Sequence, residues 1–235
     1  MPTIIAFETS SDTASVSLMK ADGFIQTRTS PGVTTHSQTI LPMIQALLAD
    51  AKLTVANCDA IAFGCGPGSF TGVRTACGVA QGLAFGAALP LIPVVSLMAM
   101  AQTCRTDHHV TDVLAILDAR MKEVYWAQYR HDENGFWQTV IAPRITPPEA
   151  VMPDGEPAAC GNGLIAYADA FAFLPVAARY TGIVPDSAAV AILGKAAYQR
   201  GETIAAQAAS PLYLRNKVAY TTEERRIMKE GAGAC

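Results

Sequence analysis

The residues best placed for chemistry lie between Ala60 and Gly86, where a short apolar run gives way to a Gly-Pro-Gly loop. Gly66-Pro67-Gly68 can continue neither a strand nor a helix interior, so this stretch predicts strand, loop and helix in that order. Ser69 or Thr71 can cap the helix, whose first N–H groups attract anions. The loop is therefore either a phosphate cradle or a tight strand-to-helix turn, and it lacks the spacings of the named phosphate-binding and nucleophile motifs.

Two carboxylates occupy matching places in the sequence and are candidates for holding Mg²⁺ with ATP. Glu8 and Asp118 each end a short apolar run, and a hairpin signal follows each run, at Asp22-Gly23 and at Asn134-Gly135. The two patterns repeat at an offset of roughly 110 residues. We therefore predict the α/β class, with two similar halves that each contain a mixed sheet, and both acids facing one cleft between them.

The remaining elements follow from apolar spacing and capping residues. Leu91 to Val95 is expected to form a strand, and Ser96 can cap the helix after it. In the second half we expect a strand over 158–161, a helix over 164–172, and a last long helix over 186–200. The expected halves are 1–106 and 107–216, with the last helix packing back on the first half and a polar tail over 217–235.

Two helices in the first half carry apolar or small residues on more than one side. In the helix over 37–51, uncharged residues stand where a solvent face would carry charges: Pro42, Met43, Ala46 and Ala49. In the helix after the loop, small residues recur every fourth position: Gly78, Gly82 and Gly86, beside Ala76, Ala80 and Ala84. Glycine inside a helix costs about 0.5–1 kcal/mol relative to alanine, so this strip indicates close approach of another backbone. That backbone belongs either to the protein's own sheet or to another helix, from the same or a different chain.

Composition excludes several classes of protein. With 235 residues, of which 51% are hydrophobic, the chain is long enough for one large domain or two small ones. Its six cysteines form no CxxC pair, which indicates reduced core thiols and no structural metal. A net charge of −3 disfavours unaided binding of nucleic acid. With no apolar run of about 20 residues and no signal-peptide core, we expect a cytoplasmic protein without membrane contact.

Six segments carry a resemblance to a known family: FETSSDTASVSL (7–18), HSQTILPMI (36–44), GPGSFTGVR (66–74), QGLAFG (81–86), LDARMKEVYWAQY (117–129) and PLYLRN (211–216). In this order they resemble the TsaB family, also called YeaZ, over nearly the whole chain. The resemblance implies an actin-like (ASKHA, RNase H-like) fold. It also implies a companion role beside TsaD, the paralogue that transfers a threonylcarbamoyl group to adenosine 37 of tRNAs that read ANN codons. The ATPase TsaE would complete the complex, and tRNA would be contacted only indirectly.

The relation to TsaD implied by this resemblance turns on a missing pair of histidines. The TsaD family binds its metal through HxxxH, whereas Ser96 and Met100 stand at those positions here, and neither replaces an imidazole. Cys65 stands where many members of the TsaB family have a basic residue in the loop. We therefore interpret the chain as a non-catalytic scaffold subunit without a cofactor. The alternative is an ATP-using or peptidase-like enzyme of the actin-like superfamily.

Two sets of site residues follow from this interpretation. The expected interface with TsaD, or with a second copy in a homodimer, consists of His36, Ile40, Pro42, Met43, Ala46, Phe70, Thr71, Arg74, Gly78 and Gly82. The loop and cleft expected to face a nucleotide at the junction of the complex consist of Glu8, Gly66, Gly68, Ser69 and Asp118. No catalytic residue and no metal ligand is expected.

Overall fold

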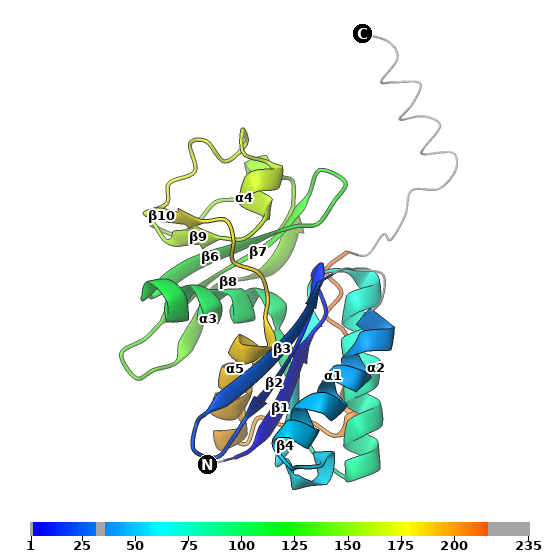
Figure 1. Ribbon diagram of the computed structural model, residues 1–235. Coiled ribbons are helices and arrows are strands. Elements are labelled where there is room, and N and C mark those ends of the chain that lie inside the picture. The colour runs from blue at the N-terminus through cyan, green and yellow to red at the C-terminus, as the bar shows by residue number, and fades with distance from the viewer. Residues whose placement is uncertain (1, 32–35, 216–235) are drawn as a thin grey trace, which may run out of the picture.

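The computed structural model describes residues 2–31 and 36–215, which form two five-stranded sheets, one in the lower and one in the upper part of Figure 1. The polar tail expected over 217–235 lies outside the described residues.

The first sheet is mixed, as predicted. Its strands are Ile4–Glu8 (β1), Thr13–Met19 (β2), Ile25–Pro31 (β3), Ala60–Gly66 (β4) and Leu91–Val95 (β5), in the order β3-β2-β1-β4-β5. β1 pairs antiparallel with β2 and parallel with β4, so the sheet combines a meander with a parallel edge. Gly23 has a φ of +91° and donates its N–H to the Lys20 carbonyl at 2.9 Å, which confirms the predicted hairpin turn.

The second sheet repeats the first in order and direction. Its strands are Asp112–Asp118 (β6), Val124–His131 (β7), Trp137–Thr146 (β8), Ala158–Cys160 (β9) and Ala178–Tyr180 (β10), in the order β10-β9-β6-β7-β8. β6 pairs antiparallel with β7 and parallel with β9, as β1 does with β2 and β4. The prediction of two similar α/β halves with mixed sheets is therefore confirmed, and Glu8 and Asp118 end equivalent strands.

The main helices are His36–Asp50 (α1), Phe70–Ala87 (α2), Ser96–His108 (α3), Gly163–Ala166 (α4) and Ser187–Gln199 (α5), with short 3-10 helices at Val55–Asn57, Pro148–Ala150 and Ala206–Ala208. Within the described residues, no helix is both long and apolar enough to cross a membrane. α1 and α2 lie side by side on one face of the first sheet (Figure 1).

The alternation of side chains along β1 explains how the first sheet is covered on both faces. Ile5 and Phe7 point to the core under α1 and α2, whereas Ile4 and Ala6 point to the core under α5. The second contact is close, because a Cβ at Gly194 of α5 would lie 2.6 Å from the Ala62 Cβ of β4. All of β1 is therefore buried, as its run of apolar residues from Ile4 to Phe7 requires, and Glu8 at its end is buried with them.

Two helices cross between the halves. α3 follows β5 in the chain, but its Leu97, Met100 and Cys104 pack in the core of the second sheet. α5 follows the second sheet, yet Ala189 and Val190 pack on the first. The residue boundaries expected for the two halves stay a prediction, and each half completes its core with a helix from beyond the boundary.

The helix predicted over 164–172 is wrong in extent, because α4 ends at Ala166. Tyr167 leaves the helical conformation, with φ −132° and ψ +46°, and its hydroxyl donates to Asp118 at 3.0 Å. Farther on, Arg179 donates to the carbonyls of Phe171 and Leu174, which holds this segment in a series of turns. Side-chain bonds from other elements therefore override the local helical pattern.

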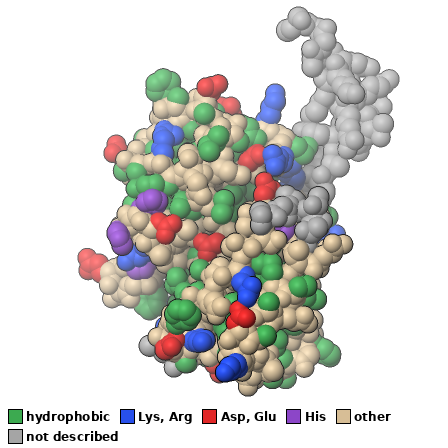
Figure 2. All heavy atoms as spheres, in the orientation of Figure 1, with side chains coloured by type: hydrophobic (Ala, Val, Ile, Leu, Met, Phe, Trp, Pro, Cys, Tyr) green, Lys and Arg blue, Asp and Glu red, His purple; other side chains and the backbone are tan. Residues whose placement is uncertain are grey.

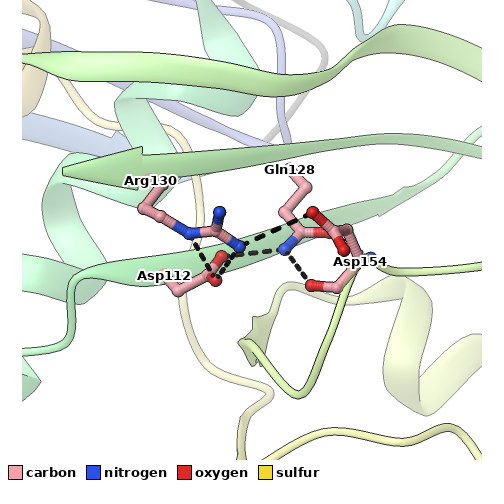
Figure 3. Close-up of polar contacts among 4 residues, drawn as sticks. All are labelled: Asp112, Gln128, Arg130 and Asp154. Atoms are coloured by element: carbon pink, nitrogen blue, oxygen red, sulfur yellow. Dashed lines mark hydrogen bonds and ion pairs between the residues drawn. The ribbon is translucent and has the colours of Figure 1, made fainter. Parts of the chain in front are cut away.

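A buried polar network ties the loop after β8 to the second sheet (Figure 3). Gln128 is completely buried, and its amide nitrogen donates to Asp112 Oδ1 at 2.8 Å and to the Asp154 carbonyl at 2.9 Å. Its amide oxygen accepts the Asp154 N–H at 2.8 Å. Arg130 donates to the other oxygen of Asp112 at 2.6 Å. The network therefore extends from the buried Gln128 to the exposed Arg130 at the protein surface.

We expect Gln128→Leu to lower the free energy of unfolding by about 2 kcal/mol, because it removes the three hydrogen bonds that the buried amide makes to Asp112 and to the Asp154 backbone. Urea unfolding measures the change. Gln138 is an exposed glutamine of β8, so Gln138→Leu is the matched control. It should change the free energy of unfolding by less than about 0.5 kcal/mol. Equal effects of the two substitutions would contradict the assignment.

Candidate functional site

Glu8 lies at the end of β1 in a sealed polar cluster. Its Oε1 accepts the Ser10 N–H at 2.6 Å, and its Oε2 accepts the Ser96 hydroxyl at 2.7 Å. The Ser10 hydroxyl donates to Ser96 at 3.1 Å, and Gly64 leaves the space that the carboxyl group fills. The prediction that Ser96 caps α3 is wrong. Ser96 is the first residue of the helix, and its hydroxyl donates to Glu8.

Burial raises the pKa of the Glu8 carboxyl above its usual value, and hydrogen bonds from Ser96 and Ser10 offset part of the shift. Between the ordinary and the raised pKa, the folded state keeps a proton that the unfolded state has lost. Stability should therefore fall as pH rises through this window.

We expect Glu8→Gln to remove this pH dependence, because an amide does not titrate. Its oxygen can still accept the Ser10 N–H, and its NH2 group can donate to the Ser96 hydroxyl oxygen once that hydroxyl turns. Urea unfolding of wild type and variant from acidic to neutral pH measures it, with the exposed Glu133→Gln as the control. Parallel pH profiles for wild type and Glu8→Gln would count against the role of Glu8.

Asp118 occupies the equivalent strand end but has different surroundings. Its Oδ1 accepts the Arg120 N–H at 2.7 Å and the Tyr167 hydroxyl at 3.0 Å, and its side chain is 11% exposed. Because Glu8 has no exposed surface, the expectation that both acids face one open cleft is wrong for Glu8. The repeat places the two acids alike, but α3 closes over only one of them.

The Gly-Pro-Gly loop is packed against the turn between β1 and β2. A Cβ at Gly68 would lie 2.5 Å from the Ser10 carbonyl oxygen, which instead accepts the Ser69 N–H at 2.7 Å. Thr9 donates its hydroxyl to the Gly72 carbonyl at 2.7 Å, and Ser69 caps α2 by accepting the Gly72 N–H at 3.4 Å. These contacts favour the tight-turn interpretation, and a nucleotide-facing role for the loop stays a prediction.

The outward side of the two adjacent helices is the other candidate site, and we call it the α1–α2 face. Its exposed residues are Ser37, Gln38, Leu41, Pro42, Gln45 and Ala49 on α1, and Phe70, Thr71, Arg74, Gly78, Gly82, Phe85 and Gly86 on α2. Leu41 and Phe70 are each 42% exposed and Phe85 is 76% exposed. Apart from Asp50 at its end, α1 has no charged side chain, and α2 has only Arg74. Figure 2 shows this side of the molecule, where uncharged surface dominates over α1 and α2.

The glycine strip lies on this face. No atom of the described residues lies within 4 Å of a Cβ placed at Gly78, Gly82 or Gly86, so the protein's own sheet is not the backbone that the strip accommodates. The alanines that were expected beside the glycines lie on the opposite side of α2, buried against the sheet: Ala76, Ala80 and Ala84. The helix therefore has two small-residue faces, one packed inside and one open.

Two residues expected at the partner interface belong to the interior instead. Ile40 has no exposed surface and joins the core under α1. His36 is 4% exposed, and its Nε2 donates to the Ser11 carbonyl at 2.9 Å, which fixes the start of α1 to the β1–β2 turn. Met43 and Ala46 are half-buried at the margin of the face.

Sequence reasoning missed the segment from Pro211 to Arg215, which crosses from one half to the other. Leu212 donates its N–H to the Cys65 carbonyl at 2.8 Å, and Arg215 donates to the Ala119 carbonyl at 3.0 Å and to Glu123 at 2.6 Å. Tyr213 lies against Arg74 of the α1–α2 face. The PLYLRN motif was the signal that marked this segment.

Comparison with known proteins places this geometry in a family. The chain is 39% identical to the tRNA threonylcarbamoyladenosine biosynthesis protein TsaB of Escherichia coli K12, over 92% of this chain and 96% of that protein. It is 37% identical to the protein of the same name from Haemophilus influenzae, over 93% and 95% of the two chains. The chain belongs to the TsaB family.

Structure and family models agree with this assignment to the TsaB family. The crystal structure of YeaZ from Pseudomonas aeruginosa matches 91% of this chain and 100% of its own, with 34% identity and a TM-score of 0.85. A family model described as TsaD, tRNA N6-adenosine threonylcarbamoyltransferase, matches residues 31–224. The fold is therefore actin-like, and the kinship of the TsaB and TsaD families is visible in this chain.

The positions that resemble the TsaD metal ligands are built into the interior of this TsaB-family chain. Ser96 is bonded to Glu8, and Met100 has no exposed surface and packs in the core of the second sheet. Within residues 2–31 and 36–215, no three His, Cys, Asp or Glu side chains group closely enough to hold a metal ion. Cys65 in the loop is also buried, and burial raises the pKa of its thiol to about 12.

Proposed function

We propose that this chain is a non-catalytic subunit in tRNA threonylcarbamoyladenosine biosynthesis and that it docks on a TsaD protein through the α1–α2 face. The observation that carries the proposal is the open glycine strip of α2, flanked by exposed apolar side chains on a surface with a single guanidinium. A soluble helix pair without a partner would carry charges on such a face.

The geometry of helix packing supports a helical partner. Packed helices lie about 8–10 Å apart, and small side chains at the contact permit this approach. Complete burial of a fully exposed leucine or phenylalanine side chain contributes about 1.5–3 kcal/mol, so Phe85 would contribute more than the partly covered Leu41 and Phe70. Because the TsaD family model matches this chain, a TsaD protein is expected to have an equivalent helix pair, and the four helices would form a bundle.

Two further points support a scaffold role in place of catalysis. Ser96 and Met100 are engaged in the interior, and Glu8 is sealed by α3. The catalytic groups would then belong to TsaD, with TsaE as the third protein of a cytoplasmic complex. tRNA would be reached through that complex. A second copy would occupy the same α1–α2 face when the chain is alone, but more weakly than TsaD does.

Reconstitution tests the proposal. Purified chain, TsaD, TsaE and tRNA, supplied with threonylcarbamoyl-adenylate and ATP, should form threonylcarbamoyladenosine only when all are present, and the chain should co-elute with TsaD. The chain alone should neither transfer a threonylcarbamoyl group nor hydrolyse ATP or peptides. Undiminished transfer without the chain, or ATP or peptide turnover by the pure chain that Glu8→Ala abolishes, would contradict the proposal.

A further inference from the structure

Arg74 of the α1–α2 face is held between two exposed aromatic rings, Phe70 of the same face and Tyr213 beside it. Its guanidinium carbon lies 3.8 Å from the centroid of the Phe70 ring and 5.8 Å from that of Tyr213. Its Nε donates to the Tyr213 hydroxyl at 2.7 Å. The two rings are 5.8 Å apart at an angle of 34°, so they hold the guanidinium in place before any partner arrives.

The charge of Arg74 is not compensated within the described part of the chain. The ion pairs found there join other arginines to carboxylates, including Arg28 to Asp50 and Arg215 to Glu123. No carboxylate oxygen of the described residues lies within 4.0 Å of Arg74, and its terminal nitrogens donate to no described acceptor. A guanidinium fork that is fixed and unpaired fits a carboxylate from outside.

A second copy of this chain could not supply that carboxylate from the same face. The only acid on α1 is Asp50, at its far end and paired with Arg28, and α2 has none. A two-fold contact between two α1–α2 faces would bury two guanidinium groups without partners, which is unfavourable.

We infer that Arg74 makes the α1–α2 face selective for a different chain whose contacting helix carries an aspartate or glutamate, over a second copy of this chain. The inference rests on the proposed docking to TsaD and adds the chemistry of the contact. Selectivity then comes from a repulsive element against self-pairing as well as an attractive one toward the partner.

The test compares Arg74→Met, Arg74→Lys and wild type in binding to TsaD, at low and high salt, and in self-association by sedimentation. Arg74→Met should lose about 30-fold or more in affinity for TsaD and most of the salt dependence. Arg74→Lys should lie between, because it keeps the charge without the fork. Self-association of Arg74→Met should become stronger, because the substitution removes both unpaired guanidinium groups, and unchanged self-association would contradict the repulsive element. Arg144→Met is the matched control, because Arg144 also stacks on an aromatic ring, 5.1 Å from Trp126 in the second half, and both readouts should match wild type.

Each contrary outcome has a separate meaning. If wild type binds TsaD and Arg74→Met binds as tightly, the inference is wrong and the proposed function stands. If wild type does not bind TsaD, the proposed function fails and takes the inference with it. Equal weakening of self-association and TsaD binding overturns the selectivity. Loss of tRNA binding by Arg74→Met, with TsaD binding intact, assigns the guanidinium to phosphate and overturns the carboxylate.

Discussion

Gly82→Leu should weaken binding to TsaD by about 100-fold while the protein melts at or above the wild-type temperature. The side chain would project outward from the α1–α2 face, because no atom within residues 2–31 and 36–215 lies within 4 Å of a Cβ at Gly82. Leucine also favours a helix over glycine by about 0.8–1 kcal/mol, so the fold should not suffer. Isothermal titration with TsaD and a thermal melt measure the two effects.

Gly182→Leu is the matched control for this substitution. Gly182 is also exposed, with nothing within 4 Å of a Cβ, but it lies in the second half before Ile183. It should leave TsaD binding unchanged. If Gly82→Leu binds as wild type does, or if both variants lose binding alike, the α1–α2 face is not the docking surface.

Gly72→Ala should lower the free energy of unfolding by about 3 kcal/mol, whereas Gly78→Ala in the same helix should raise it by about 0.5–1 kcal/mol. A Cβ at Gly72 would overlap the Thr9 carbonyl oxygen and lie 2.9 Å from its carbon, and neither group can move without opening the β1–β2 turn. At Gly78 the methyl group would meet no atom of the described part of the chain within 4 Å, and the helix gains propensity.

Chemical denaturation of both variants measures the difference in sign. Both variants replace glycine by alanine in α2, so the change in helix propensity is the same. The difference between them therefore measures the cost of the close backbone approach at Gly72. Stabilisation by Gly72→Ala, or a clear loss at Gly78→Ala, would show that the packing of α2 is not as described.

Local signals predicted the parts of the fold that short-range physics decides. Asp22-Gly23 predicted the hairpin between β2 and β3, and Asn134-Gly135 the one between β7 and β8. The acids after two apolar runs located equivalent strands. Ser69 was one of two candidate caps, and the structure selects it because its hydroxyl reaches the Gly72 N–H. Pattern alone therefore gave the class, the repeat and most element positions.

The misses depend on contacts between distant segments. Periodicity could not tell that Ile40 lies inside while Leu41 lies outside, because both fit an apolar stripe. Ser96 is a reasonable cap by type, but Glu8, far away in sequence, takes its hydroxyl. The direction of the glycine strip was likewise undetermined, since a run of small residues fits a sheet and a partner equally well.

The crossing of α3 and α5 also affects how the chain is made. β1, β2 and β4 leave the ribosome early, but one face of their sheet is covered by α5, which comes after residue 186. At about 5–20 residues per second, the interval between β5 and α5 is on the order of 10 s. During that time Ile4, Ala6 and their neighbours lack their final cover, and the nascent chain offers an apolar sheet face to chaperones. A message truncated before Ser187 would yield a protein that proteases recognise, even though its first sheet is complete in sequence.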